Sequence, residues 1–209
     1  MNAEPASFRH GVELLGPWPE WRELLSVIGG VTAGAIETAQ AGPLEDKPVG
    51  AQRAINYVFK ERLTQLGWNS EVLVFPTPSY AKKQGIEPPS QDFPERKIDF
   101  MKNHLGIEIA FNHESYLERI LFRLNVASEA DGVIPGHEVV AGIIVVASDR
   151  VKRWGRMDPS VATYEGAQRT LEFVRHSFSV PLILVGLFPD DEPNWPEKSS
   201  TFWGNHSKS

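Results

Sequence analysis

The stretch that decides the fold is Lys97–Arg119, KIDFMKNHLGIEIAFNHESYLER. It contains one acid, Asp99, then a short polar stretch, and then a second acid, Glu108, inside an apolar run. Residues 101–106 predict a turn, because asparagine and glycine favour turn conformations. Residues 107–112 alternate in polarity, and in a strand such alternation places neighbouring side chains on opposite faces. We therefore predict a β-hairpin whose second strand keeps Glu108 on its less apolar face.

A hairpin of this kind brings Asp99 and Glu108 close together. Two carboxylates held side by side repel each other unless a cation lies between them. Ligands that offer only oxygen suit Mg²⁺ better than zinc. We therefore predict a magnesium site, to which the backbone carbonyl of Ile109 could add another oxygen. The alternative is a pair of solvated surface acids, because most Asp and Glu side chains in proteins are exposed.

Composition limits the classes to which the chain can belong. Its 209 residues, 41% hydrophobic and 23% charged, suit one globular domain. The absence of cysteine excludes disulfides and thiolate metal sites. No apolar run reaches the length of a membrane span and the first residues carry no apolar signal segment, so we expect a cytoplasmic protein that is not in a membrane. The net charge of −6 argues against indiscriminate coating of nucleic acid but permits a local basic cleft.

Hydrophobic periodicity predicts an α/β protein. Helical spacing indicates helices over 20–28, 31–40, 50–66, 113–126 and 164–176, and strand patterns cover 70–75, 139–147 and 181–188 besides the hairpin. Residues 76–95 contain five prolines and predict a long loop. The sum is a mixed β-sheet of about five strands flanked by helices. We expect a single domain over 1–209, with a core of about 50–188, a helical N-terminal part over 1–49 and an irregular tail over 189–209.

The order of these motifs resembles the PD-(D/E)xK nuclease fold and, more narrowly, the BglII/BstYI type of type II restriction endonuclease. IDF at 98–100 is followed by IEIAFN at 107–112, which is similar to the family's Asp, then Glu-x-Gln or Glu-x-Glu, then aromatic-Asn. LERILFRLN (117–125), GIIVVASDR (142–150) and PLILVGL (181–187) follow in the family's order. The resemblance covers about residues 50 to 188.

This resemblance implies a sequence-specific endonuclease that cuts double-stranded DNA at a short palindromic site with Mg²⁺. A homodimer would serve such a site, because two identical active sites match two strands related by a two-fold axis. Asp99 and Glu108 would be its catalytic acids. The family's third position falls on Ala110, which can neither bind a metal nor hydrogen-bond a water. Candidate replacements elsewhere in the chain are Glu61, Lys102 and Glu114.

Two other functions remain open at this point. The first is a DNA-binding protein whose nuclease fold no longer cuts, and Ala110 favours it. The second is an α/β protein that does not bind nucleic acid and carries only surface acids, which the overall acidity favours.

Candidate DNA contacts fall in two places. Asn112 and His113 follow the second hairpin strand, although Asn112 could equally cap the next helix. The second group follows the strand 139–147 and comprises Arg150, Lys152, Arg153, Arg156, Ser160 and Thr163. We expect Arg150, Ser160 and Thr163 to read base edges and the other basic residues to contact phosphates. A solvated basic turn is the alternative for this group.

Overall fold

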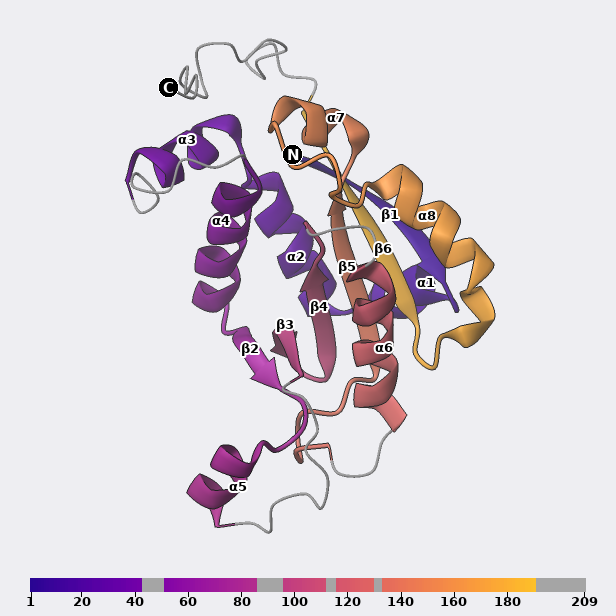
Figure 1. Ribbon diagram of the computed structural model, residues 1–209. Coiled ribbons are helices and arrows are strands. Elements are labelled where there is room, and N and C mark those ends of the chain that lie inside the picture. The colour runs from indigo at the N-terminus through magenta and orange to yellow at the C-terminus, as the bar shows by residue number, and fades with distance from the viewer. Residues whose placement is uncertain (43–50, 86–95, 112–115, 130–132, 191–209) are drawn as a thin grey trace.

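A computed structural model of the protein describes residues 1–42, 51–85, 96–111, 116–129 and 133–190. A six-stranded mixed sheet runs through its centre in the order β1-β6-β5-β4-β3-β2 (Figure 1). The strands are β1 (Asn2–Phe8), β2 (Asn69–Leu73), β3 (Lys97–Lys102), β4 (Leu105–Ile109), β5 (Ala141–Ala147) and β6 (Leu182–Phe188). Strands β4, β5 and β6 are parallel to one another, and the remaining pairs are antiparallel. The predicted mixed α/β sheet is confirmed.

Helices cover both faces of this sheet (Figure 1). One face packs against α1 (Gly11–Leu15), α2 (Pro19–Gly29), α3 (Ala33–Ala41) and α4 (Ala51–Gln65), and the other against α6 (Tyr116–Glu129) and α8 (Tyr164–Phe173). The shorter elements are α5 (Pro78–Gln84), α7 (Asp149–Trp154) and a 3-10 turn, η1 (Arg175–Ser177). Successive residues of β5 point to opposite layers, so Ile143 joins one apolar cluster and Ile144 the other.

The strand β1 corrects the prediction that residues 1–49 are helical. It pairs antiparallel with β6 along its whole length, from Asn2 opposite Phe188 to Phe8 opposite Leu182. Its sequence, NAEPASF, lacks the alternation of polar and apolar residues that marks a half-buried strand, because most of this edge strand is exposed. A proline at position 5 is compatible with an edge strand but argues against a central one. The sheet therefore has one strand more than expected.

The predicted loop over 76–95 also needs correction, because α5 begins inside it. The Thr77 hydroxyl caps this helix by accepting a hydrogen bond from the Tyr80 amide at 3.2 Å, and Pro78 occupies the first turn. Gly85 ends the helix with φ of 66°. These cap signals are present in the sequence, but the high proline content obscured them. Residues 86–95 lie outside the described part of the chain.

The predicted N-terminal helices are confirmed to within a few residues by α2, α3 and α4. Gly67, with φ of 80°, stands after α4 in the left-handed conformation expected at that end. Within the described ranges, no single helix is long and apolar enough to cross a membrane. The pair α2 and α3 reaches that length and composition only when both are counted together, and it is bent by 74° at its break.

The central hairpin has a tighter turn than predicted. Asn103 and His104 alone form it, both in the left-handed region with φ of 48° and 65°, as a two-residue hairpin turn requires. Gly106 belongs to β4, where it lies beside Gly142 of β5. A Cβ atom at Gly106 would lie 3.3 Å from the Leu124 side chain of α6, and one at Gly142 would lie 2.9 Å from it. This pair of glycines therefore lets α6 pack closely on the sheet.

Candidate active site

Glu108 is a charged side chain inside the protein core. It is only 1% exposed, because α6 covers the face of β4 that was expected to be less apolar. Its Oε2 accepts a hydrogen bond from Nη2 of Arg123 at 2.9 Å. Its Oε1 is buried and receives no hydrogen bond from any residue that the structure describes. Of the two Glu108 oxygens, one thus accepts a hydrogen bond and the other accepts none from the described residues.

Asp99 reaches the same place from β3. Its Oδ2 accepts a hydrogen bond from the backbone amide of Ile109 at 2.8 Å. This bond crosses the hairpin and ties the carboxylate to the residue that follows Glu108. The structure therefore brings Asp99 and Glu108 together across the hairpin, and it places the Ile109 amide, not the expected carbonyl, against Asp99.

Burial is the main cause of the unusual ionisation of both acids. It raises the pKa of Asp99 above its ordinary value of 3.8, against the opposing effects of the Ile109 amide and the Arg123 charge. It raises the pKa of Glu108 well above 4.5, and the neighbouring charge of Asp99 raises that pKa further, while Arg123 lowers it. The two acids therefore resist being ionised together unless a cation joins them.

This arrangement fits a hard divalent cation. Asp99 and Glu108 offer carboxylate oxygens, and the buried Oε1 of Glu108 receives no hydrogen bond from the described residues. The Ile109 carbonyl, the third ligand expected from the sequence, accepts a hydrogen bond from the Phe111 amide at 3.1 Å. Mg²⁺ is commonly held by one or two carboxylates and completes its shell with water and substrate oxygens. Within the described ranges, no third Asp, Glu, His or Cys joins the pair to form a metal-binding group.

The candidate replacements for Ala110 do not meet the carboxylate pair. Lys102 is three residues after Asp99 in β3, an odd spacing that places the two side chains on opposite faces. Its Nζ donates to both carboxylate oxygens of Glu23 at 2.8 and 2.9 Å and to the Leu66 carbonyl at 2.8 Å. Glu114 lies outside the described residues. Ala110 itself is 3% exposed and packs into the apolar cluster beneath α6 and α8.

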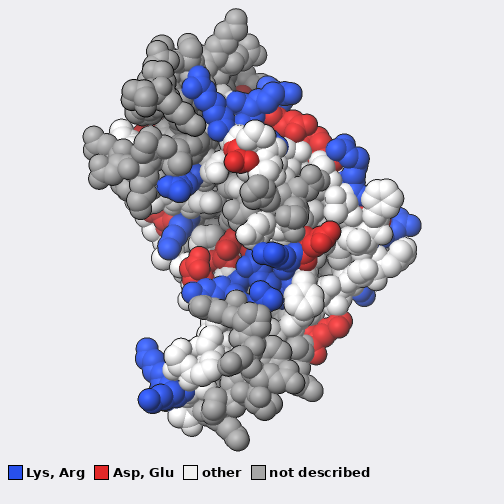
Figure 2. All heavy atoms as spheres, in the orientation of Figure 1, with Lys and Arg blue, Asp and Glu red and all other residues white. Residues whose placement is uncertain are grey.

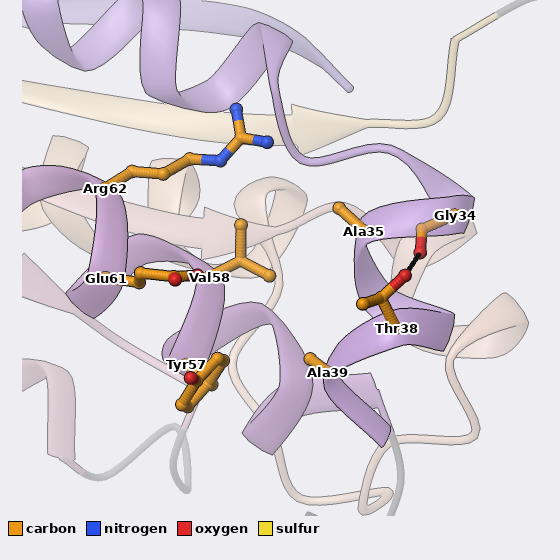
Figure 3. Close-up of a pocket in the computed structure, with 8 residues that line it drawn as sticks. All are labelled: Gly34, Ala35, Thr38, Ala39, Tyr57, Val58, Glu61 and Arg62. Carbon is orange, nitrogen blue, oxygen red and sulfur yellow. Dashed lines mark hydrogen bonds between the residues drawn. The ribbon is translucent and has the colours of Figure 1, made fainter. Parts of the chain in front are cut away.

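Glu61 lies on α4, whose apolar residues pack on the face of the sheet opposite to α6. It lines a pocket of about 400 Å³ between α3 and α4, together with Tyr57 and Arg62 (Figure 3). On the α3 side of that pocket, the Thr38 hydroxyl donates to the Gly34 carbonyl at 2.8 Å. The structure therefore separates Glu61 from Asp99 and Glu108 by the thickness of the sheet.

Sequence reasoning missed two residues of this site. Arg123 lies within the quoted motif LERILFRLN, but only the packing of α6 shows that it meets Glu108. Glu71 lies in β2, where the pairs Ser70–Phe100 and Val72–Ile98 bracket the place opposite Asp99. Its charge raises the pKa of both Asp99 and Glu108. It also has a positive φ of 55°, which is uncommon for a residue with a side chain. Both residues reach the site through contacts with distant parts of the chain, so no local sequence pattern marks them.

Most of the predicted DNA contacts gather at the carboxyl end of β5. Arg150 is exposed and lies in the first turn of α7, so it does not project from the strand end as expected. Arg153 and Arg156 are also exposed. Lys152 is held in place, because its Nζ donates to the carbonyls of Pro159 at 2.6 Å and Val161 at 2.7 Å. Three arginines are thus presented to solvent here.

The predicted hydroxyl contacts have structural partners. Thr163 caps α8, since its hydroxyl accepts from the Gly166 amide at 3.4 Å. Ser160 bonds to Asp158 through both its amide, at 2.8 Å, and its hydroxyl. Asn112 and His113 fall outside the described residues.

The raised pKa values predict how stability depends on pH without metal. A carboxyl whose pKa is raised on folding stabilises the protein fully below its unfolded pKa, and this stability is lost as pH rises through the folded pKa. In EDTA, the wild type should therefore lose stability through this pair as the pH rises above about 4, and we compare unfolding at about pH 4 and pH 8. Asp99→Asn keeps an acceptor for Ile109 but removes one repelling charge, so its loss should be smaller. At the higher pH the variant should be more stable by on the order of 1 kcal/mol.

Urea unfolding at the two pH values measures this difference. Glu172→Gln, a change to an exposed acid, serves as the control and should follow the wild type. An Asp99→Asn variant that is less stable than wild type at the higher pH would contradict the prediction.

The fold and site can be compared with known proteins. The family model described as "Restriction endonuclease BglII/BglIII" matches residues 3–187. A crystal structure of restriction endonuclease BglII in complex with a DNA 16-mer has a TM-score of 0.62 at 20% identity, covering 91% of this chain and 78% of that chain. Free BglII has a TM-score of 0.55 at 19% identity, with 91% and 81% covered. A search of curated proteins finds no significant match. The chain belongs to the BglII/BglIII restriction endonuclease family, whose members are type II site-specific deoxyribonucleases.

Proposed function

We propose that this protein is a Mg²⁺-dependent endonuclease that hydrolyses double-stranded DNA at a short palindromic site, as a homodimer. The observation that carries the proposal is the pair formed by the partly buried Asp99 and the buried Glu108, held together across the β3–β4 hairpin in a chain of the BglII/BglIII family. We further propose that residues 1–209 form one nuclease domain that works in the cytoplasm. Pairing of β1 with β6 supports a single body.

Each residue of the site would have a distinct part in phosphodiester hydrolysis. Asp99, Glu108 and the Ile109 carbonyl would hold the metal. A bound Mg²⁺ would polarise the scissile phosphate and lower the pKa of a bound water. The Ile109 amide fixes the Asp99 carboxylate, so this ligand needs little reorganisation when the metal arrives.

The distribution of charge supports a DNA partner despite the net charge of −6. Figure 2 shows Lys and Arg side chains gathered near α7 and in a band across the region of β3 and α6. A local concentration of basic side chains beside the acid pair can bind phosphates whatever the overall charge of the protein. Restriction endonuclease BglII, whose fold is similar, was crystallised in complex with DNA, which agrees with this choice of partner.

Removal of either acid should stop cleavage. Asp99→Ala and Glu108→Gln each remove a metal ligand, and we expect single-turnover cleavage with Mg²⁺ to fall by at least about a thousandfold. Binding to DNA at low salt should persist in both variants, because it depends on phosphate contacts. The assay is cleavage of mixed-sequence DNA with and without Mg²⁺, with Glu129→Gln as a matched control on the exposed end of α6.

The same assay decides between a nuclease and a DNA-binding protein that no longer cuts. Ala110 is the observation that favours the second function, because it leaves the usual third position without a polar group. Full cleavage by either acid variant would contradict the site. A wild type that binds DNA in Ca²⁺ but never cuts in Mg²⁺ would establish the second function instead.

Two exposed arginines should separate sequence reading from phosphate binding. We propose that Arg150 reads a base edge, so that Arg150→Ala costs about 1–3 kcal/mol and blurs discrimination at one base pair. Arg153→Ala should weaken all sequences alike and reduce the salt dependence of binding. Arg153 is a cleaner comparator than Lys152, whose ammonium group already bonds to two carbonyls. Binding of cognate and singly substituted sites in Ca²⁺ at two salt concentrations tests both, and equal weakening of every sequence by Arg150→Ala would refute its role.

The homodimer has support on the surface of the α6–α8 layer. Phe122 of α6 is 57% exposed and Phe173 of α8 is 88% exposed, and a second subunit could cover both rings. We expect sedimentation to show a dimer at micromolar concentration and Phe173→Asp to shift it toward monomer. Leu14→Asp, a change to an exposed leucine of α1, is the control. Monomers alone, both free and on DNA, would count against the proposal.

A further inference from the structure

We propose that Arg123 supplies the fixed positive charge of this active site, in which Ala110 leaves the family's third position without a polar group. The inference rests on the proposed nuclease function. It names a further residue for that reaction, one that comes from α6 and not from the hairpin. Its basis is the contact between Arg123 and Glu108, the position of both side chains, and the free atoms that they leave.

The guanidinium is oriented by two contacts from two strands. Its Nη2 donates to Glu108 Oε2 at 2.9 Å and its Nη1 donates to the Lys97 carbonyl at 3.0 Å. The fork of an arginine can satisfy two such acceptors at once, whereas a lysine ammonium lacks this planar geometry. Arg123 is therefore held in one orientation over the acid pair by both β3 and β4.

Two buried atoms at this contact have no hydrogen-bond partner among the described residues, and one of them is a carboxylate oxygen that a metal could take. Glu108 Oε1 receives no hydrogen bond and Arg123 Nε makes none within the described part of the chain, and both atoms are buried. A metal can take Oε1 without displacing Arg123 from Oε2. The Arg123 side chain is 23% exposed, so it spans from the buried acid to the surface. It can thus face a phosphate oxygen while it stays bonded to Glu108.

The charge of Arg123 should influence metal binding and catalysis in opposite directions. Arginine does not lose its proton in proteins, so it cannot activate water as a base. It can stabilise the negative charge that develops on the phosphate. The same positive charge lies near the metal position and must repel the ion, because like charges a few ångströms apart repel strongly in a partly buried site. Arg123 therefore lowers the metal affinity of the free protein and raises the rate on DNA.

Arg123→Met tests both effects, with Arg123→Lys as the variant that keeps the charge. Calorimetric titration of Ca²⁺ into the DNA-free protein should show binding tighter by about tenfold or more in Arg123→Met and near wild type in Arg123→Lys. If Arg123→Met is too unstable for calorimetry, its melting temperature should rise with Ca²⁺ more than that of the wild type. At saturating Mg²⁺, single-turnover cleavage by Arg123→Met should be at least about a hundredfold slower, and Arg123→Lys should fall between it and wild type.

Arg119→Met is the matched control, because Arg119 lies one turn earlier on α6 and stacks on Tyr116 at 4.9 Å, and it is not among the charges that shift the pKa of Asp99 or Glu108. It should leave Ca²⁺ affinity unchanged. Ca²⁺ binding by Arg123→Met that is no tighter than wild type, or wild-type cleavage by this variant at saturating Mg²⁺, would overturn the inference. A wild type that binds no Ca²⁺ and does not cut would instead overturn the proposed function and, with it, this inference.

Discussion

The structure depends on the close approach of two carboxylates, one buried and one partly buried, across the β3–β4 hairpin. Glu108 is buried and Asp99 is tied to the next residue of the same hairpin, so neither can turn away from the other. Two unit charges about 4 Å apart repel by about 4 kcal/mol at an effective dielectric constant of 20. Arg123 compensates only one of them, so a net negative charge remains whenever both acids are ionised. Binding of a cation between the two carboxylates would offset this repulsion and stabilise the folded protein.

Several features of the fold hold the two carboxylates close together. The two-residue turn at Asn103 and His104 fixes the register of β3 against β4, and this register brings Asp99 to the amide of Ile109. Gly106 and Gly142 remove the side chains that would hold α6 away from the sheet. Because α6 packs closely on the sheet, Arg123 lies within hydrogen-bond distance of Glu108. On the other face, Lys102 ties the same hairpin to Glu23 of α2. The hairpin is thus held from both layers.

Local sequence patterns predicted the elements that have strong periodicity or flanking signals. The hairpin, the buried strands β5 and β6 and the amphipathic helices could be found in this way, and the motif order indicated the family. The edge strand β1 could not, because an exposed strand with proline and polar residues lacks an apolar pattern. Arg123 could not be assigned either, since its partner lies fifteen residues away on another element. Ala110 showed that a group was missing, but only tertiary packing could show what lies beside it.

The other candidates for the third catalytic group lie on the opposite face of the sheet from the two acids. Lys102 and Glu61 were chosen for their chemistry, and each is a reasonable catalytic group by type. Strand parity sends Lys102 to the α2 side, and α4 carries Glu61 on that same side. The residue next to the acids is therefore an arginine, whose charge is permanent and whose geometry suits carboxylate and phosphate alike. This favours a site that works by charge stabilisation, with water activation left to the metal.

The most direct test of the central claim is anomalous diffraction from crystals of the protein soaked in Mn²⁺, which accepts the same oxygen ligands as Mg²⁺. The account predicts a peak within ligand distance, about 2.0–2.4 Å, of both Asp99 and Glu108 Oε1, with Arg123 still bonded to Oε2. A peak elsewhere, or none at these carboxylates when Mn²⁺ supports cleavage by the same preparation, would contradict it.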